Sequence, residues 1–303
     1  MLNTERVAQA VRRLELAVDR RIDGQLHGHH RGLTPGQGSE PGDTRPYQPG
    51  DDVRRIDWSV TARTSQVHVR DQVADRDLQA WLVVDASAGM RFGTASSDKF
   101  TVATGMAAAI GFLSAHHQNR VGAVVVAGGD LQVVPPRPGR DQVRGIVGRL
   151  VALGAPEPAP TGASALATAL ERLAATERRR GFLAVVSDFL ASGWERPLGV
   201  LGQRHDLLAV EVVDPRELDL GDLGQLTVAD PATGVRREVR LTRSVRERYA
   251  TAAAEQRAEH RRRILAAGAD HLVVSTADDW LSTVVAHVQR RRTQVLHPRM
   301  VGR

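Results

Sequence analysis

Two carboxylates and two hydroxyls stand beside apolar runs, in positions where they could hold a hard cation. Asp85 and Ser87 come at the end of the run LVVD, Ser164 begins the run SALATAL, and Asp188 directly follows the run FLAVVS. Oxygen ligands of this kind suit Mg²⁺, which prefers near-octahedral oxygen coordination and usually keeps several waters. We therefore expect these four side chains to form a magnesium site.

These residues lie far apart in the sequence, so a sheet must bring them together. In an open, doubly wound sheet, the loops at the carboxyl ends of the strands converge and bind ligands. Gly89 stands two residues after Ser87, where a third oxygen is missing, so we expect a water in its place and weak binding of the cation. The alternative is that Asp85 and Ser87 only cap the next helix and accept hydrogen bonds from loop amides.

The order of apolar patterns predicts an α/β fold, with a mostly parallel sheet and helices on both faces. A helix over 4–22 comes first, and a loop rich in Gly and Pro follows over 24–50. Strands are then expected over 80–85, 121–127, 131–134, 182–187, 207–213 and 271–275. Helices are expected over 98–115, 140–152, 164–176, 195–203, 243–267 and 279–291, with a hairpin near 222–241. This predicts an N-terminal part over 1–76 and a main domain over 77–303.

A dense run of charges, GDDVRRIDW, lies in the N-terminal part. Apolar and polar residues alternate after it, which predicts a half-buried strand over 56–63 and a second strand from Val67. The acids could be paired carboxylates for acid–base chemistry, but no nucleophile, histidine base or phosphate-binding glycine loop accompanies them. We favour a structural or partner-docking role, in which acids and arginines pair and pin the strands, for Arg45, Tyr47, Gly50, Asp51, Asp52, Arg54, Asp57, Trp58 and Arg63.

The composition excludes several classes of protein. The chain of 303 residues contains no cysteine, which rules out disulfides, thiolate metal sites and cysteine nucleophiles. Lys99 is the only lysine, and no P-loop motif is present. No apolar run approaches the roughly 20 residues that span a bilayer, and the N-terminus is charged where a signal peptide needs apolar residues. We expect a cytoplasmic protein.

The net charge of +6 raises the alternative of a binder of nucleic acid or an anionic surface. Glutamates are interspersed with the arginines of the run 243–267, which is typical of a solvated helix face. Aromatic residues make up only 4% of the chain, which leaves few platforms for base stacking. We therefore expect no nucleic-acid partner.

The pattern Asp85-x-Ser87-x-Gly89, with Ser164 in GASALATAL and Asp188 in VVSDF, resembles the metal-ion-dependent adhesion site of von Willebrand factor A-type domains. Gly89 departs from that pattern, which has a second serine, and Ser164 stands where threonine is usual. The block RPYQPGDDVRRIDW, followed by TAR, resembles the signature of the family called domain of unknown function 58, and this resemblance extends from about residue 20 to the C-terminus.

The resemblance implies a von Willebrand factor A-like fold and association with MoxR-type AAA+ ATPases. We therefore expect a non-enzymatic adaptor that engages a protein client or a MoxR-like ATPase through the face formed by Asp85, Ser87, Ser164 and Asp188. The main alternative is a metal-dependent hydrolase or phosphatase that uses Asp85 and Asp188. A missing second aspartate and the lack of a well-placed lysine argue against it.

Overall fold

A computed structural model of the chain describes residues 4–25, 44–47, 53, 56–70, 79–115, 119–127, 130–153, 165–229 and 235–296. The chain divides into two compact units, Met1–Thr34 with Leu78–Arg303, and Pro35–Asp77. Helix α1 (Thr4–Gln25) belongs to the larger unit, whereas the division expected from the sequence groups it with the small β element. Val11 and Val18 of α1 explain this, because both are buried in the core of the larger unit.

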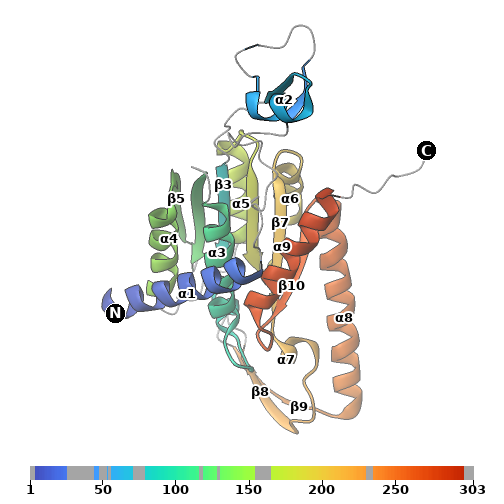
Figure 1. The fold of residues 1–303 in the computed structure, drawn as a ribbon. Coiled ribbons are helices and arrows are strands. Elements are labelled where there is room, and N and C mark those ends of the chain that lie inside the picture. The colour runs from blue at the N-terminus through green and yellow to red at the C-terminus, as the bar shows by residue number, and fades with distance from the viewer. Residues whose placement is uncertain are drawn as a thin grey trace, which may run out of the picture. The chain divides into compact units, whose positions relative to one another are not determined.

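A six-stranded sheet forms the centre of the larger unit (Figure 1). Its order is β10-β7-β6-β3-β4-β5, and every pairing is parallel except that of β5 with β4. The predicted α/β fold with a mostly parallel sheet is confirmed. The strands are β3 (Gln79–Asp85), β4 (Arg120–Ala127), β5 (Asp130–Pro138), β6 (Phe182–Ser187), β7 (Asp206–Val213) and β10 (Asp270–Ser275).

Helices cover both faces of this sheet, so its central strands are apolar on both sides. One core is built with residues of α1, α3 (Lys99–Ser114), α4 (Arg140–Ala152) and α9 (Trp280–Leu296). The other is built with residues of α5 (Ala165–Thr176), α6 (Glu195–Gly202) and α8 (Arg243–Ala266). Helix α3 is buried all round, with Thr101 as its one exposed residue, so a charged residue on it needs a special reason.

Shorter elements complete the larger unit. A 3-10 turn, η2 (Ala88–Arg91), follows β3, and the short helix α7 (Pro215–Leu218) follows β7. Strands β8 (Gln225–Ala229) and β9 (Arg236–Arg240) pair antiparallel with each other. Within the described residues, no helix combines the length and the apolar character needed to cross a membrane.

The small unit corrects one prediction. The strand expected over 56–63 is wrong, because helix α2 (Trp58–Thr64) occupies this segment. The carboxylate of Asp57 accepts hydrogen bonds from the backbone N–H groups of Ser59 and Val60, at 3.0 and 3.2 Å. This is helix N-capping, a local interaction that outweighs the alternating pattern. The second strand is present as β2 (His68–Arg70), which pairs antiparallel with β1 (Thr44–Pro46).

Candidate functional site

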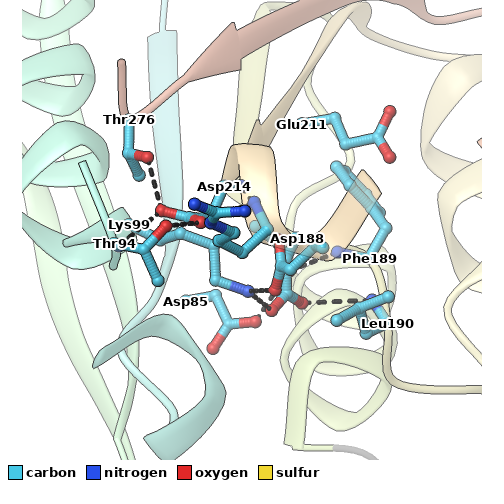
Figure 2. A network of polar contacts seen from close by, with 12 residues as sticks. Asp85, Thr94, Lys99, Asp188, Phe189, Leu190, Glu211, Asp214 and Thr276 are labelled. Atoms are coloured by element: carbon cyan, nitrogen blue, oxygen red, sulfur yellow. Dashed lines mark hydrogen bonds and ion pairs between the residues drawn. The ribbon is translucent and has the colours of Figure 1, made fainter. Parts of the chain in front are cut away.

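Two predicted site residues lie at the carboxyl ends of neighbouring parallel strands (Figure 2). Asp85 is the last residue of β3, and Asp188 directly follows the last residue of β6. Ser87 directly precedes the turn η2, at its N-cap position. Ser164 lies outside the described residues. The sheet therefore brings together two carboxylates that are more than a hundred residues apart in the sequence.

Asp85 is buried, and each of its carboxylate oxygens accepts a hydrogen bond from the fold. Its Oδ1 accepts a hydrogen bond from the backbone N–H of Ser87 at 2.9 Å, and its Oδ2 accepts one from the hydroxyl of Ser187 at 2.6 Å. Burial, with the nearby Asp188 carboxylate as the second cause, raises the pKa of Asp85. The side chain of Ser87 makes no capping hydrogen bond in η2. Asp85 thus binds a loop amide, as the alternative interpretation of this stretch expects.

Asp188 is held by an unusual backbone conformation at the next residue. Phe189 has a φ of +55°, in the left-handed region that a bulky side chain rarely adopts. Such a residue costs on the order of 1–3 kcal/mol and persists only where its surroundings hold it. Here the ring of Trp194 packs edge-on at 5.0 Å, and its indole N–H donates to the carbonyl of Phe189. The turn lets Asp188 Oδ1 accept a hydrogen bond from the N–H of Leu190 at 3.1 Å.

Lys99 completes the site, and sequence reasoning missed it. Its ammonium donates to Asp188 Oδ2 at 2.7 Å and to Glu217 Oε1 at 2.5 Å, and its side chain is only 1% exposed. The expectation that this chain has no well-placed lysine, which counted against a hydrolase, is therefore wrong, because Lys99 lies beside Asp188. A signal was present in the sequence, because the single lysine of the chain begins an otherwise apolar helix.

The position of Lys99 is costly without its partners. It lies in the first turn of α3, where the helix dipole disfavours a positive charge. Burial alone would lower the pKa of Lys99, but the carboxylates of Asp188 and Glu217 outweigh burial and raise it. The ammonium is therefore charged, and the two acids keep it so.

A second network, built around Asp214, holds Glu217, the other acid that contacts Lys99. Asp214 caps α7 and accepts hydrogen bonds from the hydroxyls of Thr94 and Thr276, at 2.5 and 2.7 Å (Figure 2). Burial would raise the pKa of Asp214, but these hydrogen bonds lower it. Glu217 Oε2 accepts the backbone N–H of Asp214 at 3.0 Å, which leaves Oε1 facing Lys99. The ends of β3, β6, β7 and β10 are thus tied together around one lysine.

The candidate metal ligands among the described residues do not fit a resident Mg²⁺ well. Each of the four oxygens of Asp85 and Asp188 already accepts a hydrogen bond, and one of them faces an ammonium rather than open space. Gly89 offers no side-chain oxygen. Among the described residues there is no group of three or more acidic, histidine or cysteine side chains arranged to hold a metal ion. Magnesium at this site, with Ser164 as a further ligand, stays a prediction.

Exposed apolar side chains flank this buried cluster. Leu190 is 50% exposed, although its own N–H binds Asp188. Phe92 is 42% exposed, its ring centre lies 6.0 Å from the ammonium of Lys99, and its carbonyl accepts the N–H of Lys99. A cleft of about 240 Å³ adjoins Leu190 and extends past Trp194 to His260 of α8. We call the exposed side chains of Phe92 and Leu190, on either side of the Lys99–Asp188 pair, the strand-end face.

The charged block of the small unit is only partly described. Gly50, Asp51, Asp52 and Arg54 lie outside the described residues, as does the side chain of Arg45. The N–H of Tyr47 donates to Val67, and Arg63 Nε donates to the carbonyl of Ser59 within α2. Asp57 has a structural role as the cap of α2, and Trp58 beside it is 70% exposed.

Solved structures similar to this chain include von Willebrand factor A domains. The SpRpn10 VWA domain is 12% identical, with 70% of this chain and 95% of that chain covered and a TM-score of 0.38. BatB from Bacteroides thetaiotaomicron is also 12% identical, with 71% and 99% covered and a TM-score of 0.42.

Sequence relatives are much closer. The uncharacterized protein Rv1480 of Mycobacterium tuberculosis (strain ATCC 25618 / H37Rv) is 45% identical over 297 residues, which cover 97% of this chain and 93% of the relative. The uncharacterized protein MAV169 of Mycobacterium avium is 40% identical over 165 residues, which cover 54% of this chain and 96% of the relative. The family model described as "Protein of unknown function DUF58" matches residues 43–259. With more than two thirds of its length matched, the chain belongs to the DUF58 family.

Proposed function

We propose that this protein is an interaction module that docks a MoxR-type AAA+ ATPase on its strand-end face and acts as an adaptor toward a protein client. The observation that carries the proposal is the strained turn at Phe189. Residues held in sparsely populated backbone regions cluster at functional sites. This turn holds Asp188 inward and Leu190 outward, so it presents an apolar side chain at a fixed position above a buried ion pair.

The chemistry of the face supports a protein partner. Interfaces gain most of their energy from a few aromatic and apolar anchors that become fully buried. Phe92 and Leu190 are of this type, and both are attached through their backbones to residues of the buried cluster. A rigid anchor loses little conformational entropy on binding. The family resemblance supports the choice of a MoxR-type ATPase as the partner.

Binding of the purified MoxR-type ATPase from the same organism, measured by biolayer interferometry, tests the proposal. The double variant Phe92→Ala/Leu190→Ala is expected to weaken binding by about thirtyfold, the size of a ~2 kcal/mol hot spot. Val228→Ala/Leu265→Ala is the matched control, because Val228 and Leu265 are 50% and 48% exposed on other elements, and it is expected to bind like wild type. An equal loss of affinity in both double variants would contradict docking on this face, and so would unchanged affinity in both.

The hydrolase alternative is less well supported, although Lys99 now lies beside the acids. Asp85 is 3% exposed and Lys99 is 1% exposed, so neither reaches a substrate without rearrangement. We expect no turnover of p-nitrophenyl phosphate by the purified protein, with or without added Mg²⁺. Turnover that Asp85→Asn abolishes would instead establish an enzyme that uses this carboxylate.

The nucleic-acid alternative is weakened by the ion pairs of α8. Five of its arginines are paired with acids, and three of these pairs are with acids outside α8. An arginine paired with a carboxylate is less available to a phosphate. The basic character of this helix is thus used largely within the protein.

A further inference from the structure

The position where a third hydroxyl is missing faces the same oxygen that Lys99 contacts. A Cβ atom built on Gly89 would lie 3.5 Å from Asp188 Oδ2, and no other described atom outside residues 88–90 would lie within 4 Å. The ammonium of Lys99 lies 2.7 Å from this same oxygen. A cation that gained a ligand from residue 89 would therefore bind at Asp188 Oδ2, which already contacts the positive charge of Lys99.

We propose that Lys99 is the resident cation of the buried site formed by Asp85, Asp188 and Glu217, so that this site keeps its geometry without a divalent metal ion. The ammonium joins Asp188 at the end of β6 to Glu217 of α7, which is the bridging role that a metal ion would otherwise have. A divalent cation at the same carboxylate would lie next to this ammonium and be repelled by it.

The use of lysine here is specific. The chain has 41 lysines and arginines together, and Lys99 is the only lysine among them. A lysine ammonium is a compact point charge, whereas a guanidinium is a wide, planar group that needs matched acceptors in its plane. With its side chain 1% exposed, Lys99 sits where a compact cation fits between two single carboxylate oxygens.

The proposal predicts how metal binding responds to two substitutions. Gly89→Ser adds a hydroxyl, and within the described part of the chain its Cβ would meet no atom closer than Asp188 Oδ2 at 3.5 Å, an ordinary contact distance. Lys99→Met removes the ammonium and keeps a side chain of similar length. Gly89→Ser alone is expected to gain no affinity, because the ammonium is still present. The double variant removes the competing charge and adds a ligand, so it is expected to gain the most.

A titration with Mn²⁺ tests these expected affinities, with binding monitored by electron paramagnetic resonance and by the melting temperature. The proteins compared are wild type, Gly89→Ser, Lys99→Met and Gly89→Ser/Lys99→Met. Wild type and Gly89→Ser are expected to bind no Mn²⁺ below about 1 mM, and EDTA is expected to leave their melting temperatures unchanged. The double variant is expected to bind at least about tenfold more tightly than wild type and to melt higher with Mn²⁺. Lys99→Gln in place of Lys99→Met serves if the methionine variant does not fold.

Wild-type binding of Mn²⁺ or Mg²⁺ below about 1 mM, or a lower melting temperature in EDTA, would overturn the proposal, because the site would then hold a metal beside Lys99. A double variant that binds no better than wild type would also overturn it. The inference concerns the same site as the proposed function, but these measurements use no ATPase. Failure of ATPase binding and failure of the lysine assignment are therefore separate outcomes.

Discussion

Replacing Lys99 with methionine is expected to lower the free energy of unfolding by about 3–5 kcal/mol, the usual cost of removing one member of a buried ion pair. Three acids, Asp85, Asp188 and Glu217, surround the site, and Lys99 contacts two of them directly. Without the ammonium, buried carboxylates face each other with no compensating charge. The loss comes from these unpaired acids more than from the missing contact itself.

Urea unfolding of Lys99→Met, Asp188→Asn and the double variant measures this effect. The losses of unfolding free energy in the two single variants are expected to sum to roughly 1–3 kcal/mol more than the loss in the double variant, because the two residues are in direct contact. Thr101→Ala is a suitable control on the same turn of α3, since Thr101 is the exposed residue of that helix. A loss below about 1 kcal/mol for Lys99→Met, or strictly additive losses, would show that the ion pair does not stabilise the site.

Acidification from pH 6.5 to pH 4 is expected to remove about 3 kcal/mol of stability through His287 alone. This histidine of α9 is 8% exposed, and burial, followed by the charge of Arg291, lowers its pKa to about 4. In the unfolded chain the same imidazole has a pKa of 6.5 and takes up a proton below that pH. The folded protein does not take up this proton until pH falls to about 4, so stability falls across this window.

Urea unfolding at several values of pH, in wild type and in His287→Leu, measures this contribution. Leucine loses little hydrogen bonding, because the buried Nε2 of His287 has no hydrogen-bond partner among the described residues. Burial also lowers the pKa of His205, so both proteins are expected to lose some stability in this range. The difference between them isolates His287. Parallel curves for the two proteins from pH 7 to pH 4 would contradict the assignment.

Glu211 changes stability over a lower pH range than His287, so its titration overlaps little with that of His287. Burial would raise the pKa of Glu211, but hydrogen bonds to His260 and His271 and the charge of Arg257 lower it to about 2. The stability that comes from its ionised form is fully present above pH 4.5 and is lost as pH falls toward 2. The effect of His287 is nearly complete before that of Glu211 becomes large.

The sequence was sufficient for the sheet because its strands are nearly continuous apolar runs separated by helical patterns. The rule that ligands bind at the carboxyl ends of parallel strands then placed Asp85 and Asp188 together. The strand predicted over 56–63 was wrong. There the N-capping carboxylate of Asp57 outweighed the alternating pattern of apolar and polar residues, and a helix formed.

The rest of the site depends on distant contacts. Lys99 and Glu217 are 118 residues apart, and neither stands in a motif that names the other. A single lysine at the start of a helix is usually solvent-exposed, and only the burial of α3 on all sides shows that this one is not. The left-handed turn at Phe189 also has no sequence signal, because such turns normally use glycine or asparagine.

Hydrogen–deuterium exchange of the protein, alone and in complex with the MoxR-type ATPase, tests the interaction surface directly. We predict slower exchange on binding in residues 86–92 and 188–194, which carry Phe92 and Leu190 of the strand-end face. Exchange in β8, β9 and the C-terminal half of α8 is expected to stay unchanged. Protection confined to those elements, with no change in residues 86–92 and 188–194, would contradict the strand-end face as the site of docking.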